Sequence, residues 1–247
     1  SGSVERDIML IPPIIGVKVA VSDHRSSNPS GEDLIRLATQ ARRGGMLSGN
    51  AGLVTMHMGG GKAGLEPIFY ALDHSDLPAR NLLPTHMMRT PELMAQGAEL
   101  VRRGGYVDFT APSNEARVKE AAAQLMDFFQ LDEGVLDHVT MSSDAYGSQP
   151  RFDAAGECIG LTYSTPHSLH KMLRALTERG LPLDQALRLL TKTPAYLLGK
   201  TGQKGCLAPC ADADILVLED NLEIDSLFAR GRTALLHGEL RMKGKFE

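Results

Sequence analysis

The stretch IIGVKVAVSDHR, residues 14–25, decides how the rest of the chain is read. Its first nine residues are mostly apolar and β-branched, which predicts a buried strand of the kind found in parallel sheets. Lys18 interrupts this run, and burying a charged ammonium is costly unless a partner or a change of chemistry compensates. We therefore expect Lys18 to be buried and to have a chemical role.

Short apolar runs alternate with amphipathic stretches along most of the chain. Besides 14–22, strands are predicted at 52–59, 81–88, 106–111 and 137–145. Helices with i, i+3, i+4 apolar spacing are predicted at 31–45, 63–75, 90–105, 113–130, 166–180 and 182–199. This β-α-β order predicts an α/β fold with a parallel sheet and right-handed crossovers.

Two further segments depart from this alternating pattern of strands and helices. Residues 146–165 are predicted to form a loop with a turn at DAAG. Beyond Thr201, short apolar runs separated by Gly and Asp-Asn turns predict antiparallel strands. We therefore expect two domains, residues 1–200 and residues 201–247.

Composition limits the class of protein. The chain has 247 residues and a net charge of −4, so no basic surface for nucleic acid is expected. No apolar run reaches the length of about 18 residues that a membrane span needs, and the polar start shows no signal peptide. A small, odd number of cysteines, three, fits a reducing compartment better than a disulfide framework. We expect a cytoplasmic protein that binds neither nucleic acid nor membrane.

Polar side chains gather where the predicted strands end. Lys18 lies in the first strand, His57 ends the second, His86 ends the third and Asp144 ends the fifth. Ligands of parallel α/β folds bind at the carboxyl ends of the strands. Each residue alone has an ordinary explanation, such as a hydrogen-bonded core histidine or a turn-forming aspartate. Together, imidazole and carboxylate suit zinc and similar divalent cations.

Lys18 fits such a site by a change of chemistry. Burial lowers the pKa of a lysine and leaves a neutral, nucleophilic amine. A neutral amine can add carbon dioxide and become a carbamate, which is an anion with two oxygens that can bridge two cations. The buried group would then be a metal-bound anion instead of an ammonium.

Several motifs together resemble the amidohydrolase superfamily and, within it, the isoaspartyl dipeptidases. They are IIGVKVAVSDHRS, VTMHMGGGKAGLEPI, LLPTHMMR, MSSDAYGSQP and CADADILVLEDNLEI with ARGR. The resemblance implies a (β/α)₈ TIM-like barrel with a small β domain, a binuclear zinc site and hydrolysis of β-aspartyl dipeptides. Of that barrel we expect only about strands 4–8 here, followed by a small C-terminal β segment.

The resemblance also implies residue roles. Lys18 corresponds to a carboxylated lysine that bridges two zinc ions, and His57 and His86 to ligands of one of them. Asp144 corresponds to the ligand of the other zinc, which also transfers the proton. Arg25, Arg89 and Ser148 correspond to residues that hold the carboxylates of a small acidic dipeptide, for which an Arg fork is suited.

One departure from the family pattern is large. The family has a His-x-His pair on its first barrel strand, and this sequence contains none. We therefore expect a truncated chain or one part of a protein, which alone binds at most one zinc ion and lacks measurable activity. With the full chain present, we expect a homo-oligomer.

Other readings stay open. The chain could be a degenerate, non-catalytic relative, or another amidohydrolase such as a dihydroorotase-like enzyme or an N-acyl-amino-acid deacylase. The GGGK segment at 59–62 is not a phosphate loop, because Ala63 stands where that motif needs Ser or Thr.

Overall fold

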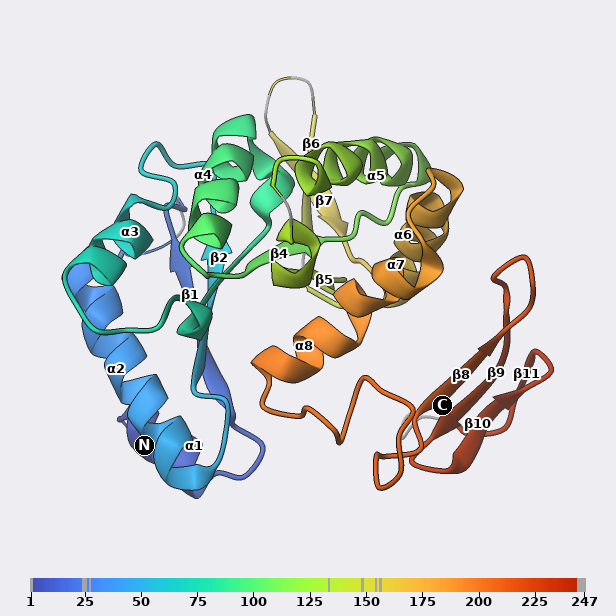
Figure 1. The fold of residues 1–247 in the computed structure, drawn as a ribbon. Helices are drawn as coiled ribbons and strands as arrows, with labels where there is room; N and C mark the ends of the chain where they lie inside the picture. Colours follow the sequence, from blue (N-terminus) through green and yellow to red (C-terminus); the bar gives the residue numbers. More distant parts are fainter. Residues whose placement is uncertain are drawn as a thin grey trace. The chain divides into compact units, whose positions relative to one another are not determined.

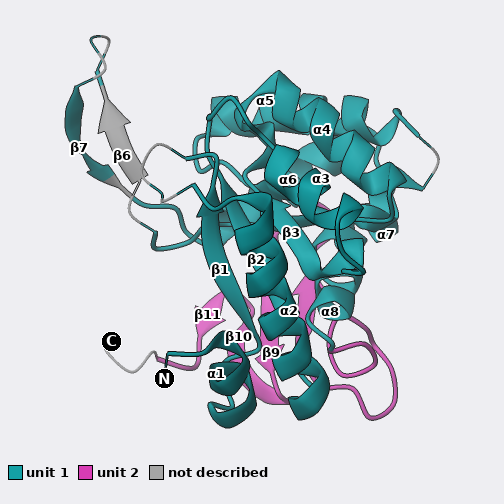
Figure 2. Cartoon of the chain, turned by 90° about the vertical axis from the view of Figure 1, so that its left-hand side faces the viewer, with its two compact units in different colours: residues 1–199 teal, residues 200–247 magenta. Residues whose placement is uncertain are grey.

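The computed structural model describes residues 2–23, 26, 28–132, 134–147, 149–153, 155 and 157–243. The chain separates into two compact units, Ser1–Gly199 and Lys200–Glu247, which Figure 2 colours differently. Each unit is described by itself below.

Parallel strands form the centre of the first unit (Figure 1). Strands β1 (Gly16–Val21), β2 (Leu53–Met58) and β3 (Leu82–Thr85) form one parallel sheet in that order, and β4 (Val107–Thr110) pairs in parallel with β5 (Val139–Ser142). The Thr85 hydroxyl of β3 donates a hydrogen bond to Asp108 of β4, which links the two sheets. All five predicted strands and their parallel direction are confirmed.

The strands alternate between an apolar and a polar face. In β2, Val54, Met56 and Met58 are fully buried, whereas Thr55 and His57 between them are partly exposed. Successive side chains of a strand point to opposite faces, so this pattern puts the apolar residues against the helices and the polar ones on the other face. The sheet therefore presents one face on which chemistry is possible.

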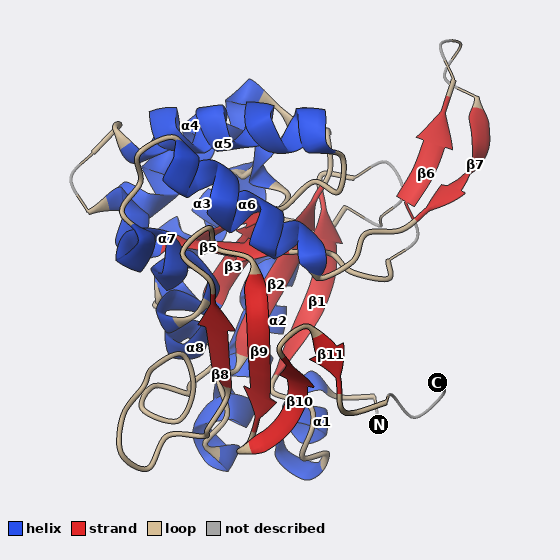
Figure 3. Cartoon of the chain, turned by 90° about the vertical axis from the view of Figure 1, so that its right-hand side faces the viewer, coloured by secondary structure: helices blue, strands red, loops and turns tan. Residues whose placement is uncertain are grey.

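Helices follow the strands in the predicted order (Figure 3). They are α2 (Gly31–Ser48), α3 (Glu66–Asp73), α4 (Pro91–Arg102), α5 (Glu115–Phe129), α6 (His167–Glu178), α7 (Leu183–Leu190) and α8 (Lys192–Leu197), with short 3₁₀ turns η1 (Ala79–Asn81), η2 (Met87–Arg89) and η3 (Val135–His138). The helix predicted over 182–199 is in fact two, α7 and α8. Pro194 has no N–H to donate to the carbonyl of Leu190, so a continuous helix would lose that bond. A further helix, α1 (Val4–Leu10), was not predicted.

The segment 146–165 is not only a loop, as predicted, but contains an antiparallel hairpin. Strands β6 (Gln149–Phe152) and β7 (Cys158–Thr162) pair with each other. The Asp153 carboxylate accepts hydrogen bonds from the backbone N–H groups of Ala155 and Glu157, both at 2.9 Å, and so closes the turn. The DAAG turn signal was right, and the strands on either side of it were missed.

The second unit is an antiparallel sheet, as the sequence predicts. Its strands β8 (Ile215–Leu218), β9 (Ile224–Ala229), β10 (Arg232–Leu236) and β11 (Glu239–Leu240) lie in the order β11-β10-β9-β8. Among the described residues, no helix of either unit is long and apolar enough to cross a bilayer.

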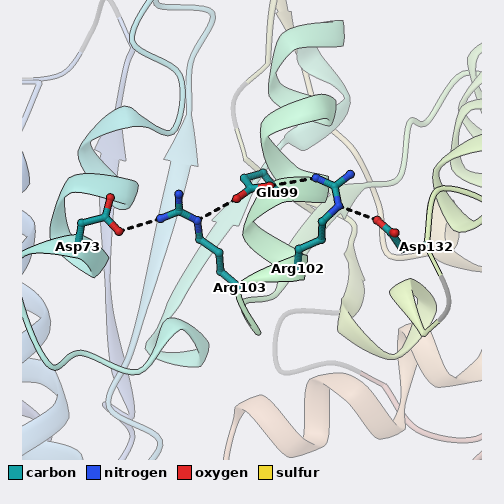
Figure 4. A network of polar contacts seen from close by, with 5 residues as sticks. All are labelled: Asp73, Glu99, Arg102, Arg103 and Asp132. Atoms are coloured by element: carbon teal, nitrogen blue, oxygen red, sulfur yellow. Dashed lines mark hydrogen bonds and ion pairs between the residues drawn. The ribbon is translucent and has the colours of Figure 1, made fainter.

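A chain of surface ion pairs joins helix α4 to its neighbours (Figure 4). Arg103 binds Asp73 of α3 at 2.9 Å and Glu99 at 3.0 Å, while Arg102 binds Glu99 at 3.0 Å and Asp132 at 2.8 Å. These side chains are exposed, so the network orients α4 against its neighbours and adds little stability.

Candidate active site

A pocket of about 320 Å³ lies along the polar face of the strands. Lys18 of β1, His86 after β3 and Asp144 after β5 all line it. The rest of its polar wall consists of hydroxyl and carboxyl groups from β2 to β5, namely Thr55, Thr85, Asp108, Thr140 and Ser142. Three residues that the sequence singled out from distant positions thus share one cavity.

The fourth residue, His57, does not line the pocket itself but contacts His86, which does. The two imidazole rings meet edge to face, with 4.3 Å between their centroids and 65° between their planes. His57 is the fifth residue of β2, and His86 directly follows β3, the neighbouring strand. Adjacent parallel strands therefore bring the two rings together at one edge of the sheet.

His86 is held in a conformation that few residues adopt. Its φ of 67° lies in the left-handed region, which costs free energy for a residue other than glycine. Its Nδ1 lies 2.6 Å from the hydroxyl oxygen of Thr110, whereas its Nε2 is buried and has no hydrogen-bond partner. A buried, unpartnered polar atom is rare in folded proteins and calls for a ligand.

The protonation state of His86 suits such a ligand. The pKa of His86 is lowered to about 4, mainly by burial and next by the nearby His57. Lys18 and Arg89 act in the same direction, while the charge of Asp144 opposes them. His86 is therefore neutral at pH 7, and if Nδ1 carries the proton toward Thr110, the lone pair lies on Nε2.

Lys18 does not have the burial that the sequence suggested. Its strand β1 is an edge strand of the β1-β2-β3 sheet, and its side chain is exposed along the pocket. The expectation that Lys18 is buried is thus wrong for the described residues, because no other strand among them pairs with the free edge of β1. What remains is the position: Lys18 lies opposite Thr55, in the wall that it shares with His86 and Asp144.

Asp144 and Arg89 lie on the loops that follow the strands. Asp144 has a φ of 46° and, like His86, a left-handed backbone. Arg89 ends η2, is about one-third exposed at 37%, and has its Nη1 4.0 Å from the Asp23 carboxylate. Arg25 and Ser148, the other two predicted substrate-binding residues, lie outside the described residues.

Two carboxylates and one hydroxyl at the strand ends were visible in the sequence but were given no role there. Asp23 is 2% exposed and its Oδ2 lies 3.2 Å from Nε2 of His57. Asp108 accepts hydrogen bonds from the hydroxyls of Thr85, Thr140 and Ser142, and burial raises its pKa to about 6. The third is Thr110, beside His86. The available signal was the regular Ser, Thr and Asp at alternate strand positions, which would have marked the polar face.

The donor set suits a divalent cation. Within the described part of the chain, no group of three or more His, Cys, Asp or Glu side chains lies close enough to hold a metal ion as it stands. Two neighbouring imidazoles, one with a buried Nε2 without a partner, and Asp144 and Lys18 in the same wall nevertheless offer the nitrogen and oxygen ligands that zinc prefers.

Known proteins resemble this chain over most of its length. A model described as Amidohydrolase family matches residues 137–237. Two solved structures of beta-aspartyl dipeptidase from thermophilic, keratin-degrading Fervidobacterium islandicum AW-1 are 38% and 34% identical in sequence to this chain. Each covers 99% of this chain, with TM-scores of 0.88 and 0.85. This chain is thus similar to proteins of the amidohydrolase family.

Similarity to other amidohydrolases is more remote. N-acetylglucosamine-6-phosphate deacetylase of Caenorhabditis elegans is 26% identical over 106 residues, which are 43% of this chain and 25% of that protein. This chain spans 64% and 62% of the two dipeptidase chains. The resemblance noted in the sequence is thus confirmed, together with the mixed α/β fold with parallel sheets.

Proposed function

We propose that the pocket holds the metal centre of a hydrolase that cleaves beta-aspartyl dipeptides. The observation that carries the proposal is the buried Nε2 of His86, which has no partner and belongs to a neutral imidazole in the same cavity as Lys18 and Asp144. The substrate class follows from the similarity to the two dipeptidases, one of which was solved in complex with beta-Asp-Leu.

Each ligand has an assigned part in this proposal. His57 and His86 would hold one zinc ion, Asp144 would hold a second, and Lys18, once carboxylated, would be a ligand of both. A bound zinc ion lowers the pKa of water and polarises a carbonyl group. His86 contributes as a neutral ligand, and Thr110 fixes the direction of its ring.

The remaining residues move the proton and orient the substrate. Asp144 accepts the proton of the attacking water and then delivers it to the leaving amine, as a general base and acid does. Arg89 points its guanidinium toward the strand ends and pairs with a substrate carboxylate, which orients the scissile bond. Arg25 and Ser148 have the same role in the proposal.

The ligand count sets a condition on activity. These 247 residues contain no His-x-His pair, and a catalytic zinc ion usually has about three protein ligands. Lys18, His57 and His86 are enough for one ion, whereas Asp144 and the carbamate alone bind a second weakly. We therefore propose turnover only where further ligands join these residues.

A chimaera tests this function. The part of the Fervidobacterium protein that this chain does not cover would be fused to residues 1–247, loaded with zinc and assayed on beta-Asp-Leu and on its α-linked isomer. We expect cleavage of the β-linked dipeptide only, and its loss in His86→Gln. Arg89→Lys keeps the charge but loses the fork, so KM rises while the melting temperature is unchanged. Equal cleavage of both isomers, or full activity of His86→Gln, contradicts the proposal.

A further inference from the structure

We infer that Asp23 is a positioning residue, which fixes the metal-binding nitrogen of His57 and holds Arg89 beside it. The inference rests on the proposed function, because it assigns Asp23 a part in that same site. Neither the sequence motifs nor the similarity to known proteins singles out this carboxylate.

The position of Asp23 is set by the backbone. It lies two residues beyond the end of β1, is 2% exposed, and its carbonyl accepts the N–H of Ser26 at 3.0 Å. The loop after β2 packs directly against it: a Cβ added to Gly59 would lie 2.3 Å from the Asp23 Cα. With backbone packed this closely around it, the carboxylate can turn toward few partners.

Two of its partners are residues that the site needs in a fixed geometry. Oδ2 of Asp23 lies 3.2 Å from Nε2 of His57 and 4.0 Å from Nη1 of Arg89. With Asp23 ionised and His57 neutral, the carboxylate only accepts hydrogen bonds, so Nε2 of His57 carries the proton. The lone pair of His57 then lies on Nδ1, and Nδ1 is the atom that would meet a cation.

His86 shows the opposite arrangement. Its Nδ1 contacts the Thr110 hydroxyl and its Nε2 has no partner, so His86 would bind through Nε2. Metal-binding histidines commonly donate their second ring N–H to a carboxylate or another oxygen, which fixes the tautomer and the ring direction. Asp23 gives His57 this support, as Thr110 does for His86.

The same oxygen also faces Arg89. A buried carboxylate between an imidazole N–H and a guanidinium is compensated on both sides. Asp23 thereby ties a metal ligand to a substrate-binding residue. Its loss should affect both the retention of metal and the binding of substrate.

The tautomer of His57 tests the inference without metal or substrate. Metal-free protein labelled with ¹⁵N in its histidines would be studied by long-range ¹H–¹⁵N NMR at about pH 8.5, where unperturbed histidines are neutral. We expect His57 in the Nε2–H form in the wild type, and a mixture of both forms in Asp23→Asn and Asp23→Ala. His86 should keep its tautomer in all three proteins and serves as the internal control.

Zinc affinity, measured by competition with a chromophoric chelator, is the second readout. We expect a decrease of about 10–100-fold in Asp23→Asn, as for other residues that support a metal-binding histidine. Asp73→Asn removes an exposed aspartate that also pairs with an arginine, and should bind zinc like the wild type. In the chimaera, Asp23→Asn should also raise KM through Arg89.

The outcomes distinguish the role of Asp23 from the proposed metal centre. Wild-type His57 in the Nδ1–H form, or a tautomer unchanged in both Asp23 variants, overturns the role of Asp23 even if zinc binds well. Absence of zinc binding by the wild type overturns the proposed metal centre, while the NMR result still decides whether Asp23 orients His57. Should Asp23→Ala not fold, the wild-type tautomer and the isosteric Asp23→Asn decide the question.

Discussion

The backbone conformation, the neighbours and the protonation state of His86 together leave its Nε2 atom available for a ligand. Its left-handed backbone turns the side chain into the pocket, Thr110 engages Nδ1, and burial keeps the ring neutral. Strained residues persist where the surrounding structure holds them, and they gather at functional sites. The free Nε2 of His86 is therefore the residue-level basis of the proposed metal centre.

Lys18 should act as a carbamate and not as an ammonium. It is exposed along the pocket and faces the wall with His86 and Asp144. In the zinc-loaded chimaera, Lys18→Ala should abolish turnover, and short carboxylic acids should restore part of it by supplying the bridging oxygens. Turnover would be measured with beta-Asp-Leu. An unimpaired Lys18→Ala variant, before any acid is added, would remove Lys18 from the site.

Asp108 makes the stability of the fold depend on pH. Burial raises its pKa from 3.8 to about 6, so between these values the native protein binds more protons than the unfolded chain. The contribution of Asp108 to the free energy of unfolding is fully present below about pH 4 and is lost as pH rises through 6. The loss is on the order of 3 kcal/mol. Asp108→Asn lacks this loss.

Urea denaturation of the metal-free wild type and of Asp108→Asn, from about pH 4 to pH 7, measures the effect. Relative to the variant, the wild type should become less stable with rising pH. Stability curves that run parallel for the two proteins would show that Asp108 does not titrate in this window.

At the scale of elements, the glycine-rich loop after β2 has a packing role. The N–H of Gly59 donates to Val21 at 3.1 Å, and that of Gly61 donates to Ser22 at 2.7 Å, so the loop lies against the end of β1. A Cβ on Gly59 or Gly61 would lie 2.3–2.5 Å from that backbone, whereas one on Gly60 would meet nothing within 4 Å. The GGGK segment, which resembles a phosphate loop, thus brings two strand ends together.

The three consecutive glycines supply a matched pair of variants. Gly59→Ala pushes the loop away from Asp23 and should lower the free energy of unfolding by about 1–3 kcal/mol, as overpacking does. Gly60→Ala should stay within about 0.5 kcal/mol of the wild type. Chemical denaturation measures both. Equal effects of the two substitutions would mean that the close approach of Gly59 to Asp23 does not constrain the fold.

The elements were predicted better than the contacts between them. Hydrophobic periodicity and turn residues are local signals, so the five parallel strands and the C-terminal antiparallel sheet could be read directly. The hairpin at 149–162 was missed because its apolar residues Ile159 and Leu161 are exposed and form no core. The division of 182–199 depends on one proline within a strongly periodic stretch.

The sequence suggested four residues of the proposed site, but not the side chains that contact and orient them. Strand-end placement marked Lys18, His57, His86 and Asp144, since parallel strands bring their carboxyl ends together. The partnership of Asp23 with His57 and of Thr110 with His86 depends on side-chain direction and on loop packing, which spacing along the chain does not encode. The exposure of Lys18 likewise depends on which strand covers the edge of β1.

At the scale of the whole molecule, the proposed chemistry belongs to the unit Ser1–Gly199. All four proposed metal ligands lie in it, and the unit Lys200–Glu247 contributes none of them. The chain spans 64% of the more similar dipeptidase. The number of metal ions bound by these residues alone must therefore be measured on this chain and cannot be taken from the relative.

Zinc binding to the metal-free chain tests the central claim most directly. Titration of residues 1–247 against a chromophoric chelator should give about one tightly bound ion, the number that Lys18, His57 and His86 can hold. His57→Gln and His86→Gln should each abolish tight binding, whereas His74→Gln, an exposed histidine stacked on Tyr70 of α3, should not. No tight binding by the wild type, or the same binding in His86→Gln, would contradict a metal centre at this pocket.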